Sequence, residues 1–488
     1  MAAPTYSGVI PYEESQRRER RMQVWLLLGC LAVAGMGVVV GFELALAGAA
    51  LLFATALLAP NFAPCLTFLL VISLGISGTY VNDYRIGGEA MAGPPLSVLD
   101  LGLLLLLASC AYHLLLRRPR NPLPARLMLP LLLFAGDVLL SAVLGLQRGY
   151  GFKPMLQDLR VQVYILTCIV SVALFITRTD QLRLIAKAFL VMGALLIVQQ
   201  IGTFFASFST AEAAAGLRDS QLATVLCVLC ALIVLVFHAQ DRDVIRPAYR
   251  APYLLACGVA LLLSFGRSTW AVGLLCPLVL LFLSRDINAR ARARMGRLLF
   301  VGGALVLGLA VAGPMRDLTA QRVDVIQSGQ IDDTATLARL IDLDQAWTQF
   351  QTSPVLGVGL GLEYETRPTL TDTVITTYLH NSPLYYASKM GMVGLALLLW
   401  LYVAGSIPLY RAALKSGTES AALARAIFAF FVVFAPIGAL SGNFNAAGVG
   451  PMVGIFLGVP WMKLHEREEK AKKQAAEGAG AASAVTPG

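Results

Sequence analysis

The feature that most constrains this chain is a series of long apolar runs separated by short polar connectors. Fourteen of these runs are candidate membrane spans, because a helix needs about 20 apolar residues to cross the hydrocarbon core of a bilayer. Only 14% of the residues are charged, whereas soluble domains have about 25%. The sequence therefore predicts an all-α polytopic membrane protein with about 14 (12–14) transmembrane helices. The runs cover residues 23–42, 44–60, 64–80, 97–116, 126–146, 156–177, 185–207, 219–238, 251–266, 270–284, 298–313, 385–409, 421–439 and 448–462.

Basic residues are concentrated in alternate connectors, as they are in the cytoplasmic loops of membrane proteins. This pattern predicts that both termini are cytoplasmic and that the long loop 314–384 is extracytoplasmic. It also accounts for the net charge of +9 without any binding of nucleic acid. The basic residues of these connectors are Arg117, Arg118, Arg120, Arg178, Arg183, Arg242, Arg246, Arg250, Arg285, Arg290, Arg292, Arg294, Arg297, Arg411, Lys415, Lys463, Arg467 and Lys470.

The same pattern divides the chain into four parts. Residues 1–22 form a cytoplasmic N-terminal segment, and residues 23–250 form an N-terminal transmembrane bundle. Residues 251–462 form a second transmembrane region that includes the loop 314–384. The tail 463–488 is charged and then rich in Ala and Gly, so we expect it to be disordered in the cytoplasm. The first apolar run has ordinary spanning length, which favours an uncleaved span over a signal peptide.

Two short motifs in the sequence bear on the kind of reaction that the protein can catalyse. Cys227 and Cys230 form a C-x-x-C pair, but they lie inside an apolar run, so we interpret them as helix-packing residues and not as a redox or metal site. The chain has no glycine-rich phosphate-binding motif between a strand and a helix, and Gly357–Gly361 is interpreted as a glycine-rich turn. An enzyme that acts outside the cytoplasm without a nucleotide needs a donor that carries its own activation.

Three arginines on the predicted outer side are candidate site residues, because ionisable groups at membrane depth are functional candidates by default. Arg160 lies just inside a span, Arg218 opens another span, and Arg267 lies in the turn between two spans. Arg160 and Arg218 each have a neighbouring aspartate, so pairing or snorkelling to the interface is an alternative for both. Arg267 has no adjacent acid, which favours a functional role.

The long loop contains a predicted helix that starts near Asp333-Thr334 and stops at Ser353-Pro354. Leu340, Leu343, Trp347 and Phe350 recur at helical spacing, so we expect this face to pack on an apolar surface. Arg339 lies beside that face.

His380 is the one histidine that we place on the outer side of the membrane. Ser382 is a suitable N-cap and Pro383 suits the first helical position, so His380 stands just before the helix that spans 385–409. The positive end of that helix disfavours imidazolium and favours a nearby anion such as phosphate. A neutral His380 can accept a proton, although a lone histidine can also be structural.

Three segments in this order resemble the O-antigen ligase and polymerase superfamily. Ser264-Phe265-Gly266-Arg267-Ser268-Thr269-Trp270 is similar to its "S-R-x-x-W" hairpin, and Arg339, Trp347 and Pro354-Val355-Leu356-Gly357-Val358-Gly359-Leu360-Gly361 are similar to its "R…W…P-L-G-V-G-x-G" segment. His380-Asn381-Ser382-Pro383-Leu384, followed by Gly391 and Gly394, resembles its "H-N-x-x-L…G-x-x-G" segment.

The resemblance implies a GT-C-like membrane glycosyltransferase in the bacterial inner membrane, with 251–462 as the O-antigen ligase-like catalytic region. Such an enzyme transfers a glycan from undecaprenyl pyrophosphate to an acceptor sugar hydroxyl with inversion, without a metal or any other cofactor. His380 would be the general base, and Arg267 and Arg339 would hold the pyrophosphate. Arg160 and Arg218 would be auxiliary contacts. The implied partners are the lipid-linked glycan, the acceptor glycan, the bilayer and a chain-length regulator.

The acceptor is not readable from the residues, so several functions stay open. A polymerase would extend repeat units of exopolysaccharide or O-antigen, and the number of predicted spans favours it. A ligase would move the finished glycan onto lipid A-core, and an oligosaccharyltransferase would move it onto protein. A transporter or flippase of lipid-linked sugars is an alternative of another class, because intramembrane arginines would suit it.

Overall fold

The computed structural model describes residues 123–207, 221–264, 267–284, 289–311, 334–366, 374–379, 381–415, 417–440 and 449–462, with five further positions between 103 and 111. The predicted spans 23–42, 44–60 and 64–80 lie outside the described residues, as do most of 97–116 and the tail 463–488.

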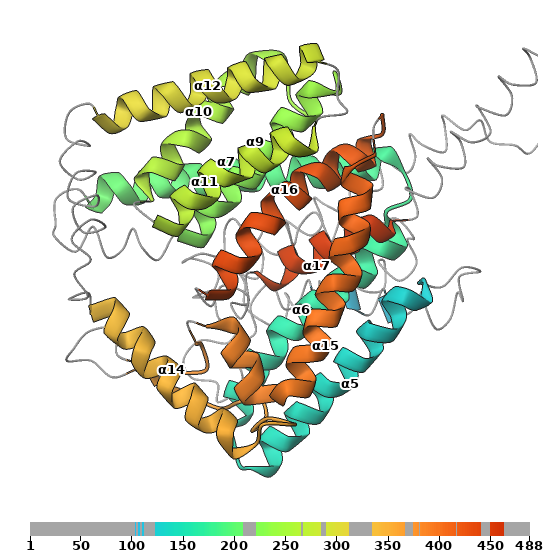
Figure 1. Cartoon of the computed structure of the whole chain (residues 1–488), viewed down its shortest axis with the longest axis vertical. Helices are drawn as coiled ribbons and strands as arrows, with labels where there is room; N and C mark the ends of the chain where they lie inside the picture. Colours follow the sequence, from blue (N-terminus) through green and yellow to red (C-terminus); the bar gives the residue numbers. More distant parts are fainter. Residues whose placement is uncertain are drawn as a thin grey trace, which may run out of the picture.

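The described chain is almost entirely helical, and ten of its helices fall on the remaining predicted runs (Figure 1). Apolar runs of this length form helices because lipid offers no partner for backbone N–H and C=O groups. These helices are α5 (Ala125–Gln147), α6 (Phe152–Phe175), α7 (Thr179–Ser207), α9 (Gln221–Ala239), α10 (Pro247–Leu263), α11 (Arg267–Leu283), α12 (Ala289–Val311), α15 (Ser382–Ala413), α16 (Glu419–Leu440) and α17 (Gly450–Gly458), which continues into the 3-10 helix η3 (Val459–Trp461).

Five of the described helices are long and apolar enough to cross a membrane, namely α5, α6, α7, α15 and α16. The apolar segments Val225–Ala239, Pro247–Leu263, Ser268–Leu283 and Gly450–Trp461 are shorter. The fold is therefore that of a helical membrane protein, while the full number of spans and the GT-C-like class stay predictions.

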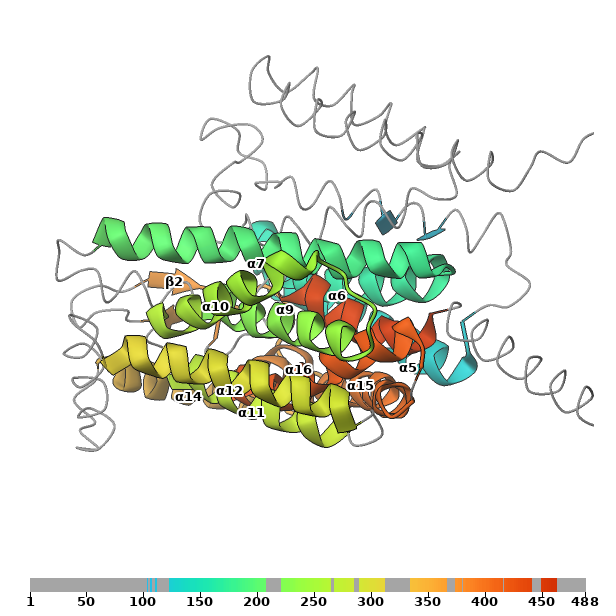
Figure 2. The same cartoon turned by 90° about the horizontal axis from the view of Figure 1, so that it is seen from above.

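The long loop adds a helix and a small sheet. The helix α14 (Thr334–Thr352) begins and ends where the sequence predicted. The strands β1 (Tyr364–Thr366) and β2 (Val374–Thr376) pair antiparallel, with Tyr364 opposite Thr376. No pattern in the sequence predicts this hairpin. Figure 2 shows α7 on one side of the molecule and α12 and α14 on the other.

Helices from distant parts of the chain pack closely. Helix α15 lies between α5 and α16, and α6 packs along α17. Gly450, Gly454 and Gly458 face α6 at four-residue spacing, and a Cβ on Gly454 would lie 2.5 Å from the Ile165 carbonyl oxygen. Small residues at this spacing allow two helix backbones to approach in a membrane. Helix α17 can therefore be short and still be held firmly.

The C-x-x-C pair also contributes to helix packing. Cys227 and Cys230 are buried thiols, and the Cys230 thiol donates a hydrogen bond to the Phe189 carbonyl oxygen on α7 at 2.9 Å. Both side chains lie against the backbone of α7 near Gly193. This arrangement agrees with the packing role that the sequence predicted.

Candidate active site

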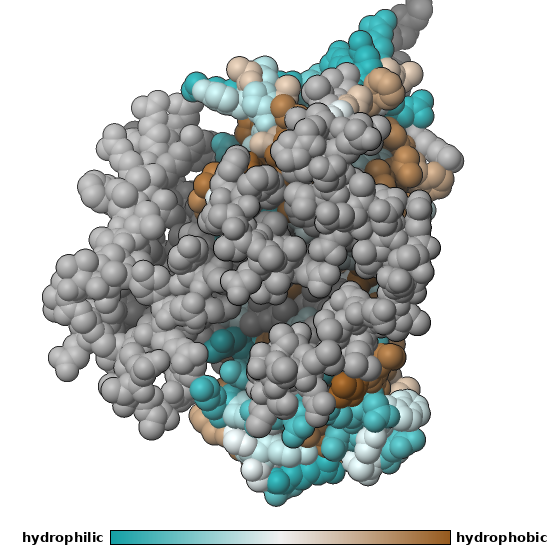
Figure 3. All heavy atoms as spheres, turned by 90° about the vertical axis from the view of Figure 1, so that its left-hand side faces the viewer, coloured by the Kyte–Doolittle hydropathy of each residue, from teal (hydrophilic) through white to brown (hydrophobic). Residues whose placement is uncertain are grey.

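The apolar face that the sequence predicted for helix α14 is only partly buried. Leu340 and Trp347 are about half exposed, at 53% and 50%, whereas Asp342 and Ala346 are buried. Gln345, on the buried side, exchanges two hydrogen bonds with the backbone of Glu365 in β1, at 2.9 and 3.1 Å. These bonds connect the helix to β1, and the expectation for its apolar residues holds only in part, because Leu343 and Phe350 are half-buried whereas the other two are exposed. The lower end of the molecule in Figure 3, where α14 lies in Figure 1, is largely hydrophilic with a few hydrophobic side chains at the surface.

The glycine-rich turn 357–361 joins three helices. Gly357, Gly359 and Gly361 have φ values of +72°, +95° and +94°, which residues with a Cβ rarely adopt. A Cβ on Gly357 would clash with the backbone of Lys389, and one on Gly359 would clash with the backbone of Gly145 in α5. The glycines are therefore required both for the conformation of the turn and for its close approach to α5 and α15.

Backbone groups of the turn are hydrogen-bonded to those helices. Val358 N–H donates to the Ser388 carbonyl, Gly359 N–H to the Lys389 carbonyl and Leu360 N–H to the Ser141 carbonyl, at 2.8, 2.8 and 2.9 Å. Helix α15 is interrupted at Gly391, where φ is +69°. Just beyond that point, Met392 N–H donates to the Pro354 carbonyl at 2.9 Å. Because of the interruption, the Ser388 and Lys389 carbonyls of α15 can accept hydrogen bonds from the glycine-rich turn.

A buried ion pair lies directly behind this turn. Lys389 of α15 and Asp158 of α6 have side chains that are 0% and 2% exposed, and Lys389 Nζ lies 2.6 Å from Asp158 Oδ2. The carboxylate also accepts from Tyr385 Oη and from Gly361 N–H, both at 2.7 Å. A charge in a low-dielectric interior needs such partners because it has lost its contact with water. Removing one partner of a buried pair therefore typically costs about 3–5 kcal/mol.

Aromatic rings complete the surroundings of the ammonium group. Lys389 Nζ lies 4.5 Å from the ring centroid of Tyr385 and 5.3 Å from that of Tyr364, within the range of cation–π attraction. The hydroxyl groups of Tyr364 and Ser388 are hydrogen-bonded at 2.7 Å. Burial raises the pKa of the Tyr364 hydroxyl, so it stays protonated at neutral pH. From the sequence alone, Asp158 is expected only to pair with Arg160.

The segments on either side of His380 are held by different contacts: the buried lysine holds the segment before it, and a helix cap holds the residue after it. Lys389 Nζ donates to the Thr377 carbonyl oxygen at 3.0 Å, and Leu379 is fully buried. On the other side, Asn381 caps α15, because its side-chain oxygen accepts from Leu384 N–H at 2.9 Å. The predicted cap, Ser382, is instead the first residue of the helix, since the asparagine one position earlier already satisfies the free N–H group.

The structure describes only some of the predicted site residues, and it does not show whether their side chains lie together. His380 and Arg218 lie outside the described residues. Arg267 is the first residue of α11 and Arg339 lies within α14, and the structure describes the backbone of both but not their side chains. Arg160 is partly buried on α6, two residues after Asp158. What the structure adds is a buried anchor beneath the His380 segment, built from Lys389, Asp158 and the glycine-rich turn. A lysine inside an apolar run was the one sequence signal that could have revealed it.

Fold and site together define a helical membrane protein with a polar loop that is anchored into its helix bundle. Residues 252–399 match the family described as O-antigen ligase. This match confirms the resemblance to the O-antigen ligase and polymerase superfamily that the three motifs indicated. It indicates a glycosyltransferase-like enzyme that uses a lipid-linked glycan and an acceptor. A search of curated proteins found no match to the chain.

Proposed function

We propose that this protein transfers a glycan from undecaprenyl pyrophosphate to an acceptor sugar hydroxyl on the extracytoplasmic face of the bacterial inner membrane. The observation that carries the proposal is that the matched region 252–399 includes Arg267, Arg339 and His380. The anchoring of Thr377 and Asn381 supports it further, because a catalytic base must be held in a fixed position relative to the reacting atoms.

The proposed step is a direct displacement. His380 takes the proton of the acceptor hydroxyl while the acceptor oxygen forms a bond to the anomeric carbon of the donor sugar. The bond from that carbon to the pyrophosphate oxygen breaks, and the configuration inverts. Arg267 and Arg339 bind the leaving pyrophosphate, whose negative charge increases in the transition state. Arg160 and Arg218 are auxiliary phosphate contacts. The donor is already activated, so the proposal includes no metal or other cofactor.

The acceptor that we favour is the next repeat unit, which makes the enzyme a polymerase of exopolysaccharide or O-antigen. The number of apolar runs in the sequence supports this choice. A deletion strain distinguishes the alternatives. Accumulation of lipid-linked single repeat units supports a polymerase, whereas accumulation of long lipid-linked chains supports a ligase to lipid A-core or to protein.

The chemistry is tested with purified protein in liposomes, supplied with a lipid-linked repeat unit as donor and acceptor. His380→Ala should lower the rate of transfer by roughly 10²–10⁴-fold, the usual contribution of a general base. His238→Ala is the matched control, because His238 ends α9 and binds Arg250 and Asp243 away from this site. Transfer at the wild-type rate by folded His380→Ala protein would contradict the proposal.

A further inference from the structure

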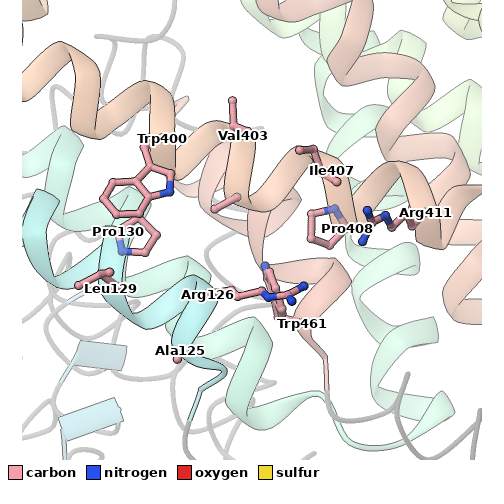
Figure 4. Close-up of a pocket in the computed structure, with 11 residues that line it drawn as sticks. Ala125, Arg126, Leu129, Pro130, Trp400, Val403, Ile407, Pro408, Arg411 and Trp461 are labelled. Atoms are coloured by element: carbon pink, nitrogen blue, oxygen red, sulfur yellow. The ribbon is translucent and has the colours of Figure 1, made fainter.

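An open groove lies at the other end of α15, far along the helix from Lys389. Its volume is about 580 Å³, and it runs between the first turns of α5 and the C-terminal half of α15, next to Trp461 (Figure 4). The side chains that form its walls are mainly apolar, and several are well exposed. They include Leu129, Pro130, Trp400, Val403, Ile407 and Pro408.

Two cations lie toward one end of this groove. Figure 4 shows the guanidinium groups of Arg126 and Arg411 on the side away from Trp400. Both arginines are exposed, and none of the described residues that line the groove is acidic. Within the part of the chain that the structure describes, neither arginine forms an ion pair. The positive charge at this end is therefore unmatched by the protein groups described.

Two further groups at this end are suited to an anion. Helix α5 begins here without a side-chain cap and without an acidic residue in its first turn, so its positive helix end is open to a negative charge. The indole Nε1–H of Trp461 is buried and has no hydrogen-bond acceptor among the described residues. Buried donors are normally paired, and this one lies in the wall of the groove beside Arg126 (Figure 4).

We propose that this groove binds an anionic phospholipid. The phosphate lies between Arg126 and Arg411, and an acyl chain follows the apolar walls toward Trp400 and Leu129. A soluble anion would leave those apolar walls uncovered, whereas a lipid satisfies both the charge and the apolar surface. Arginines near helix ends attract anionic lipids, and tryptophan is enriched at the membrane interface. The positive-inside pattern predicts that this end faces the cytoplasmic leaflet. The inference does not depend on the proposed transferase activity.

The proposal is tested by native mass spectrometry of the full chain in detergent, titrated with phosphatidylglycerol or phosphatidylcholine. Phosphatidylglycerol should bind tightly to the wild-type protein, and Arg126→Ala and Arg411→Ala should each weaken it about fivefold. Arg148→Ala is the matched control, because Arg148 is an exposed arginine at the opposite end of α5 and should leave lipid binding unchanged.

Three outcomes would overturn the lipid assignment. Equal binding of phosphatidylcholine would show that the charge is not recognised. Unchanged phosphatidylglycerol binding in Arg126→Ala and Arg411→Ala protein that elutes as a folded species would place the lipid elsewhere. Displacement of phosphatidylglycerol by inorganic phosphate at comparable concentration would show that the arginines bind phosphate without using the apolar walls.

Discussion

The two ends of α15 handle positive charge in opposite ways. At the N-terminal end, Lys389 is fully buried and is matched within the protein by Asp158, by the Thr377 carbonyl and by two aromatic rings. At the C-terminal end, Arg411 and the neighbouring Arg126 are exposed beside an apolar groove. A charge that leaves water completely must be satisfied by the fold itself, whereas one at the membrane edge can be satisfied by lipid.

The two ends of α15 therefore have different roles: the buried ion pair anchors the fold, and we propose that the groove binds lipid. The Lys389–Asp158 pair connects α6, α15, the glycine-rich turn and the segment before His380, so changing it should disturb everything that it connects. The two arginines of the groove, Arg126 and Arg411, are exposed, so changing them should alter lipid binding and leave the fold intact. Three predictions test the anchor end, from the largest expected effect to the smallest.

The largest effect is expected for Lys389→Met, which leaves Asp158 buried without its cation. Stability should fall by about 3–5 kcal/mol, measured by thermal unfolding in detergent. Lys153→Met, an exposed lysine on α6, should have almost no effect. In Asp158→Asn/Lys389→Met protein both charges are removed together, and most of the lost stability should return. If the single and double variants are equally unstable, the ion pair is not the anchor that we infer.

A smaller effect is expected for Gly359→Ala, which combines backbone strain with a clash against Gly145. Strain at a positive φ costs on the order of 1–3 kcal/mol, and the clash adds to it. Gly149→Ala is the matched control, because Gly149 also has a positive φ, +82°, but a Cβ there would meet nothing within 4 Å. Unfolding of the two variants at the same temperature would mean that the close approach of the turn to α5 does not contribute to stability.

The smallest effect is expected for Asn381→Ala, which removes the N-cap of α15. Loss of a side-chain cap costs about 1 kcal/mol, and Asn381→Asp should retain most of the stability because a carboxylate can also accept from Leu384 N–H. Thermal unfolding of the three proteins provides the comparison. A stable alanine variant together with an unstable aspartate variant would be inconsistent with capping.

The sequence predicted what is encoded locally and missed what depends on distant partners. The apolar runs predicted the helices, and the ends of α14 were predicted from Thr334 and from Ser353-Pro354. These predictions succeeded because the length of an apolar run and the residues at a helix end are local properties. The apolar face predicted for α14 is buried only in part, and Gln345 on this helix binds a strand that the sequence did not reveal. Lys389 and Asp158 are 231 residues apart, so nothing in either segment indicates that they pair.

For the candidate site, too, the sequence indicated the local motifs but not the distant contacts. The motifs around Arg267, Arg339 and His380 suggested the family, and the match over 252–399 confirmed it. The roles of these residues stay predictions, because a motif indicates chemistry but not the positions of side chains. Asp158, which completes the anchor, lies outside the matched region, and the predicted Ser382 cap was displaced by Asn381 one residue earlier.

We propose that the buried Lys389–Asp158 pair supports transfer by positioning the segment that contains His380, and a double-mutant cycle tests this role. Transfer is measured in liposomes for the wild type, His380→Ala, Asp158→Asn/Lys389→Met and the combination of all three changes, each at equal amounts of folded protein. If the pair acts by positioning His380, its removal should lower the rate at least about tenfold in the wild type. Its removal should change the rate little once His380 is absent. Equal losses in both backgrounds, or no loss in either, would contradict the account.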